Sequence, residues 1–140
     1  MLRKIVLDIE TKNFFNDVGK NEPALLDISI VAIYDSLTES YSSYLEGELN
    51  KLWPIIERAS MLIGFNSDHF DIPLLNKYYP GDLTKMRSLD ILKEIRDSYG
   101  RRMRLDQLAE GTLGKNKLGH GSDAMEWWRA GDIERVRNYC

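Results

Sequence analysis

The sequence has 140 residues, enough for one domain with a hydrophobic core. Its 43% hydrophobic and 29% charged residues are ordinary for a globular protein and exclude a disordered chain. No apolar run approaches the roughly 20 residues of a membrane span, and no signal-peptide pattern is visible at the first residues. The single cysteine, Cys140, cannot form an internal disulfide, so we expect one cytoplasmic domain without membrane attachment.

The net charge of −3 is unevenly distributed. Between residues 99 and 119, five basic residues stand against two acids, so this segment carries a charge of +3 within an acidic chain. The basic residues are Arg101, Arg102, Arg104, Lys115 and Lys117. Such a strip is compatible with nucleic acid contact at one place, although a solvated face is the more common explanation.

Residues 4–10 (KIVLDIE) are apolar and β-branched and predict a central strand. Asp8 and Glu10 are two residues apart, so both side chains point from the same face of this strand, about 6–7 Å apart along it. The apolar side chains point from the other face. Two neighbouring carboxylates in an apolar strand repel each other and lose solvation unless a cation neutralises them. Mg²⁺ prefers such oxygen ligands, so the pair suggests a metal site, whereas an exposed strand end is the simpler explanation.

The segments that follow predict a mixed α/β sheet. Further strands are predicted at residues 26–34, 40–45 and 61–65. The first three strands form a meander, because their links are too short for crossover helices. An apolar stripe within residues 49–59 predicts a helix before the fourth strand, and this order implies a right-handed crossover and a parallel pairing. The expected fold class is α/β, with a three-strand meander and then a parallel strand, flanked by helices.

Residues 63–75 pass from an apolar strand through a polar turn at Asn66 into a new helix. Asp71 comes at the strand-to-helix junction, and Pro73 falls in the first helical turn, where a missing N–H is tolerated. An acid there lies at the carboxyl end of a strand, where open α/β sheets bind ligands. Helix capping explains Asp71 about equally well when this segment is taken alone.

Two helices are predicted in the next segment, at residues 89–99 and 105–113, with Gly100 and Gly114 as their C-terminal stops. Ser88 is expected to cap the first of them. Asp90 lies in its first turn, where the helix dipole favours an acid, so we do not count it as a metal ligand.

The last predicted helix begins at Ile133 after the cap Asp132, and a glycine-rich loop at residues 115–122 precedes it. His120 lies in that loop between two glycines, where a histidine is more often exposed than catalytic. The helix pattern stops after about two turns within an apolar stripe and without a cap, so we expect the sequence to be truncated.

In this order, the motifs resemble those of the DEDD superfamily of 3′→5′ exonucleases, in its tyrosine subclass, which has a ribonuclease-H-like fold. The matching segments are Asp8-Ile9-Glu10-Thr11, Gly64-Phe65-Asn66-x-x-x-Phe70-Asp71-x-Pro73-x-Leu75 and Asn138-Tyr139-Cys140. The second has the spacing of family B DNA polymerase proofreading domains, and the third resembles the beginning of Tyr-Cys-x-x-Asp. The stretch from Leu105 to Lys117 is also similar to the family segment before the third motif. Over nearly its whole length, the sequence most resembles the predicted stand-alone exonucleases of the YprB-type group.

The resemblance implies an enzyme that hydrolyses phosphodiester bonds at the 3′ end of single-stranded DNA or RNA. Asp8, Glu10 and Asp71 would hold two Mg²⁺ or Mn²⁺ ions about 3.5–4 Å apart, one generating the attacking hydroxide and one stabilising the leaving 3′ oxygen. Tyr139 would orient the attacking water. The residues expected to contact the substrate are Thr11, Asn66, Phe70 and Lys117.

The family's fourth carboxylate would lie four residues after Tyr139, one helical turn along the same face and beyond Cys140. We therefore expect residues 1–140 to be a single ribonuclease-H-like exonuclease domain that lacks the end of the third motif, with weakened metal binding. A non-catalytic nucleic-acid-binding domain of the same fold stays open. Less favoured alternatives are another ribonuclease-H-like nuclease, such as a resolvase, and a structural domain. Nothing in the sequence favours DNA over RNA or indicates a helicase or polymerase partner.

Overall fold

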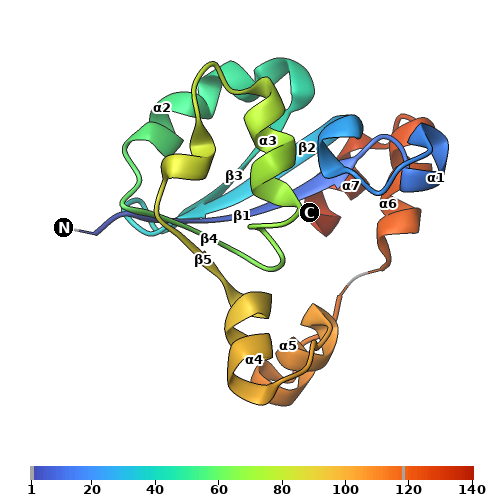
Figure 1. Ribbon diagram of the computed structural model, residues 1–140. Helices are drawn as coiled ribbons and strands as arrows, with labels where there is room; N and C mark the ends of the chain where they lie inside the picture. The colour runs from blue at the N-terminus through green and yellow to red at the C-terminus, as the bar shows by residue number, and fades with distance from the viewer. Residues whose placement is uncertain (1, 118) are drawn as a thin grey trace.

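The computed structural model describes residues 2–117 and 119–140, and a five-stranded mixed sheet forms its centre (Figure 1). The strands are β1 (Lys4–Thr11), β2 (Ile28–Asp35), β3 (Ser40–Leu45), β4 (Met61–Gly64) and β5 (Ser88–Asp90), in the sheet order β3-β2-β1-β4-β5. Antiparallel pairing joins β1 to β2 and β2 to β3, whereas β1, β4 and β5 run parallel. The meander and the parallel strand are confirmed, and β5 is a strand that the sequence did not predict.

Seven helices are described besides short 3₁₀ turns. They are α1 (Phe15–Val18), α2 (Trp53–Glu57), α3 (Asp71–Tyr78), α4 (Ile91–Tyr99), α5 (Leu105–Leu113), α6 (Gly121–Arg129) and α7 (Ile133–Tyr139), and the 3₁₀ turns are η1 (Pro23–Leu25), η2 (Glu46–Lys51) and η3 (Leu83–Lys85). The bounds of α5 agree with the prediction, whereas α6 replaces the end of the loop expected at residues 115–122. Leu118, within that loop, lies outside the described residues. None of the described helices is long and apolar enough to cross a membrane.

β1 follows the alternation that its sequence predicts. Ile5, Leu7 and Ile9 are buried on one face, where they join the main core with side chains of α2 and α3. Figure 1 shows these two helices on one side of the sheet. Full burial of each such side chain stabilises the fold by about 1.5–3 kcal/mol, so Asp8 and Glu10 are held firmly on the opposite face.

The opposite face of the sheet is covered by α6, which contacts β1, and by α7, which contacts β2. In the register of β1 with β2, Asp8 pairs with Ala32 and Glu10 pairs with Ile30. Val136 in α7 is completely buried. This packing brings the C-terminal end of α7 to the two acids of β1.

In the turn after β4, the side chain of Ser67 packs closely against the backbone of Gly64. A Cβ atom on Gly64 would lie 2.5 Å from the Cβ of Ser67, so only glycine fits without a shift. Asn66 follows in the left-handed region, with φ of 60°, a conformation in which asparagine is enriched. The sharp turn carries the chain from the end of β4 to the start of α3.

Asp90 fixes this turn from the neighbouring strand. Its carboxylate accepts hydrogen bonds from the backbone N–H of Asn66 (2.8 Å), of Asp68 (3.1 Å) and of Leu92 (3.0 Å). The expectation that Ser88 caps α4 is wrong, because Ser88 belongs to β5 and Asp90 is the N-cap. One buried carboxylate therefore joins the start of α4 to the loop after β4.

Candidate active site

A pocket of about 620 Å³ opens near the carboxyl ends of β1 and β4. Because these strands are parallel, the turns that follow them meet at the same edge of the sheet. Seven of the eight residues expected at the site line the pocket: Asp8, Glu10, Asn66, Phe70, Asp71, Lys117 and Tyr139. Thr11 is not among its lining residues, and its hydroxyl donates to the carbonyl oxygen of Asn13 (3.0 Å). Substrate contact by Thr11 stays a prediction.

The three expected metal ligands line one pocket, Asp8 and Glu10 from β1 and Asp71 from α3. One carboxylate oxygen each of Asp8 and Glu10, together with Sγ of Cys140, lie within 4.8 Å of one another. Asp71 is buried, and its Oδ1 has no hydrogen-bond partner among the described residues. Phe70 is the N-cap of α3, so the capping explanation of Asp71 does not hold.

The surroundings raise the pKa of all three carboxyls. Water reaches Asp8, yet the enclosing protein reduces its solvation and raises its pKa to about 6. Lost solvation and then the charge of Asp8 raise the pKa of Glu10 to about 8. Burial, followed by the charge of Asp8, also raises the pKa of Asp71 well above its ordinary value. A nearby cation stabilises such disfavoured charges, and hard carboxylate oxygens suit Mg²⁺ or Mn²⁺, so the donor set fits the expected ions.

α7 contributes Tyr139 and Cys140 to the pocket. The Tyr139 ring packs edge-on against Trp127 of α6, with ring centroids 5.9 Å apart. Burial, followed by the charges of Glu10 and Asp8, raises the pKa of Tyr139 to about 12, so its hydroxyl keeps its proton at neutral pH. Burial raises the pKa of the Cys140 thiol above its usual range, and Sγ lies 3.5 Å from the carbonyl oxygen of Asp8.

Basic side chains line the same pocket as the acids. The ammonium of Lys117 opposes the upward pKa shifts of Asp8 and Glu10, as a nearby cation does. Arg104 lines the pocket and pairs with Asp106 at 3.3 Å. His120 is exposed, as expected, but it also lines the pocket.

Arg104 and His120 were not among the expected site residues. The backbone N–H of His120 donates to Asp123 (2.8 Å), in the reciprocal pattern that begins α6. An acid three residues after a cap is a known signal for a helix start, so it could have placed His120 at the beginning of a helix. No comparable local signal places Arg104 in the pocket.

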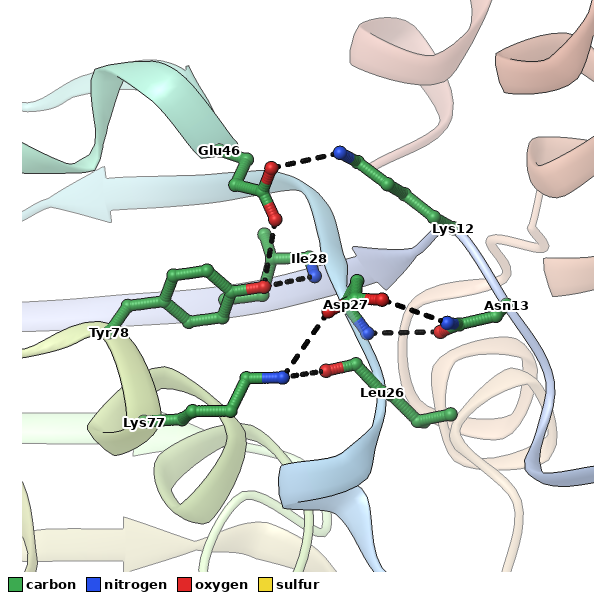
Figure 2. Close-up of polar contacts among 8 residues, drawn as sticks. All are labelled: Lys12, Asn13, Leu26, Asp27, Ile28, Glu46, Lys77 and Tyr78. Carbon is green, nitrogen blue, oxygen red and sulfur yellow. Dashed lines mark hydrogen bonds and ion pairs between the residues drawn. The ribbon is translucent and has the colours of Figure 1, made fainter. Parts of the chain in front are cut away.

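A polar network fastens the segment after β1 to β2, η2 and α3 (Figure 2). Lys12 pairs with Glu46 (2.9 Å), and the Tyr78 hydroxyl donates to Glu46 (2.8 Å) while accepting from the first backbone N–H of β2 (3.0 Å). Asn13 and Asp27 exchange two hydrogen bonds of 3.0 and 2.9 Å. The network restrains the chain just beyond the strand that carries the two acids.

The chain was compared with protein-family models, with curated proteins and with solved structures. Residues 5–135 match the family model described as RNase_H superfamily, and no curated protein matches the chain. The family B DNA polymerase of the hyperthermophilic archaeon Pyrobaculum calidifontis is similar, with 18% identity and a TM-score of 0.70 over 99% of this chain and 23% of that one. E. coli exonuclease I in complex with a dA16 oligonucleotide is similar at 12% identity and a TM-score of 0.58, over 83% of this chain and 38% of that one. The chain thus spans well under two thirds of either protein, and at these identities the likeness shows a shared fold.

Proposed function

We propose that this chain, which belongs to the ribonuclease H superfamily, is a metal-dependent 3′→5′ exonuclease acting on single-stranded nucleic acid. Superfamily membership supports a nuclease in general, and one structural neighbour holds a bound oligonucleotide. The observation that carries the proposal is the meeting of three carboxylates with Tyr139 in one open pocket.

Asp8, Glu10 and Asp71 hold the divalent ions in this proposal. Their oxygens are hard ligands, their charged forms are disfavoured without a cation, and Asp71 Oδ1 has no partner among the described residues. A pair of Mg²⁺ or Mn²⁺ ions held by these carboxylates would supply a nucleophilic water and would neutralise the charge that develops on the leaving oxygen.

The remaining residues of the pocket position the reacting groups. The Tyr139 hydroxyl, protonated at neutral pH, donates a hydrogen bond to the attacking water. Lys117 faces the acids of β1 and pairs with the scissile phosphate. Phe70 is held edge-on by Phe15, with centroids 6.1 Å apart, and offers an apolar surface to the terminal base.

A non-catalytic binding domain is the second candidate. The observation that favours it is that α7 gives the pocket Tyr139 and Cys140 but no carboxylate from its described residues. In that case the pocket binds a strand without cutting it.

A cleavage assay separates the two candidates. Single-stranded DNA and RNA labelled at the 5′ end are incubated with the 140-residue chain, a version extended beyond Cys140, and Asp71→Ala of each. We expect products that shorten stepwise from the 3′ end, only with Mg²⁺ or Mn²⁺ and only with Asp71 intact. Binding by the extended chain without cleavage favours the binding domain, and cuts within the strand contradict the exonuclease.

A further inference from the structure

A second pocket, of about 330 Å³, adjoins the first. Phe65, Asn66 and Arg104 line both, so the two pockets are neighbours that share part of their walls. Arg102 and Met103 extend the second pocket away from the acids. Its volume lies within the range of pockets that hold small ligands.

The two pockets differ in charge. Carboxylates are prominent in the first, whereas the described lining of the second contains two arginines and no carboxylate. Arg104 is already paired with Asp106 at 3.3 Å. Arg102 is exposed and makes no ion pair with another described residue, so it is the available cation of the second pocket. A guanidinium binds phosphate oxygens in a bidentate manner.

Apolar surface accompanies this cation. Phe65 and Met103 are half-buried on the wall of the pocket, and Leu92, which also lines it, is buried. An aromatic or apolar surface next to a basic side chain is the combination with which proteins hold an unpaired base and its phosphate. The second pocket thus has a partner for the base and one for the phosphate of a nucleotide.

We propose that the second pocket holds the nucleotide that precedes the 3′-terminal one, with Arg102 bound to the phosphate on its 5′ side. This inference rests on the proposed function, which assigns the terminal nucleotide and the scissile phosphate to the first pocket. Only some of the five basic residues between residues 99 and 119 take part in this assignment. Arg102, Arg104 and Lys117 each line at least one of the two pockets, whereas Arg101 and Lys115 line neither.

A pair of small probes isolates the phosphate in question. A thymidine dinucleotide with a 5′-phosphate differs from the same dinucleotide without it only by the group assigned to Arg102. Both are titrated into the ¹⁵N-labelled chain with Ca²⁺ present, and binding is followed through backbone amide shifts. We expect the 5′-phosphate to tighten binding about tenfold, the effect of one charge-assisted hydrogen-bonded pair, and to shift the amides of Asn66 and Met103.

Matched variants test the assignment to Arg102. Arg102→Gln is expected to remove the gain from the 5′-phosphate, whereas Arg101→Gln loses the same charge one residue away and is expected to keep it. Thermal melting checks that both variants fold. A phosphate effect that survives in Arg102→Gln, equal binding of the two dinucleotides, or the same shifts with inorganic phosphate alone would each overturn the assignment.

The effect of the 5′-phosphate on binding is measured without cleavage, so it tests the second pocket separately from the proposed nuclease activity. If the phosphate effect holds but labelled strands stay intact in Mg²⁺ and Mn²⁺, the second pocket stands and the proposed nuclease fails. If strands are shortened but the 5′-phosphate has no effect, the nuclease stands and the second pocket is not the site of this nucleotide.

Discussion

Asp8 and Glu10 share one face of β1, and lost solvation raises the pKa of both. An acid whose pKa is higher in the folded state binds more protons there than in the unfolded chain, so folding stability falls as pH rises through that interval. For Glu10 the interval runs from its ordinary value of 4.5 to about 8. A bound cation removes this penalty, because it stabilises the charged carboxylates.

We therefore expect the metal-free chain to lose thermal stability between about pH 5 and pH 8, and Mg²⁺ or Mn²⁺ to raise Tm most at the upper end. Glu10→Gln is expected to flatten the pH dependence and to weaken the metal effect. Melting curves across this pH range, in EDTA and with metal, measure both. Glu110→Gln, an exposed change on α5, is the control. A Tm in EDTA that rises with pH would contradict the assignment.

Tyr139 is expected to act through its hydroxyl rather than its ring. Tyr139→Phe keeps the packing against Trp127, so stability and KM should change little, while kcat falls about ten- to a hundredfold through the lost hydrogen bond. Steady-state cleavage of a short single strand gives both constants. Tyr41→Phe, at a tyrosine that is 83% exposed, is the control. An unchanged kcat in Tyr139→Phe would remove this residue from the mechanism.

At the scale of elements, β5 and α4 act on the site through Asp90. Asp90→Ala removes a helix cap and leaves the N–H groups of the Asn66 turn without their acceptor, so it should cost about 2 kcal/mol and reduce activity. Asp82 is the matched control, because it is exposed and its carboxylate caps only the short η3. Urea unfolding and the cleavage assay compare the two alanine variants. Equal effects would show that Asp90 has no special link to the site.

From the polar network in Figure 2 we predict different losses of stability at two neighbouring tyrosines, Tyr78 and Tyr79. Tyr78→Phe breaks two hydrogen bonds that join α3 to η2 and β2, and it should cost about 1–2 kcal/mol. Tyr79→Phe breaks one exposed hydrogen bond to Glu57 and should cost less than about 0.5 kcal/mol. Urea unfolding of both variants measures the difference, and a larger cost at Tyr79 would contradict it.

Elements were predictable where one local signal dominated. The start and end of α5 follow from its apolar pattern and from Gly114, whose φ of 67° suits glycine. β5 was missed because three residues are too few to show alternation, and because Asp90 is both the last strand residue and a helix cap. α6 was missed because it begins with Gly121 in a glycine-rich stretch.

At the scale of the whole molecule, the ribonuclease-H-like α/β fold predicted from the sequence is confirmed by the family model and by the structural neighbours. Periodicity predicted the mixed α/β sheet and placed the acids on β1 and at the start of α3, whereas the ribonuclease-H-like fold was implied by the resemblance of the motifs. The basic side of the pocket was less predictable. Arg104 precedes α5 and His120 precedes α6, and tertiary packing sets the distance of both segments from β1. Figure 1 shows α4 and α5 below the strands in this view. Membership of the YprB-type group stays a prediction.

The most direct test of the metal centre is anomalous X-ray scattering from crystals grown with Mn²⁺. Ions held by Asp8, Glu10 and Asp71 should give anomalous peaks between these carboxylates, and the peaks should weaken or vanish in Asp71→Ala. A folded wild-type chain without anomalous density in this pocket, or with Mn²⁺ only at other surface carboxylates, would contradict the metal centre and the hydrolysis that depends on it.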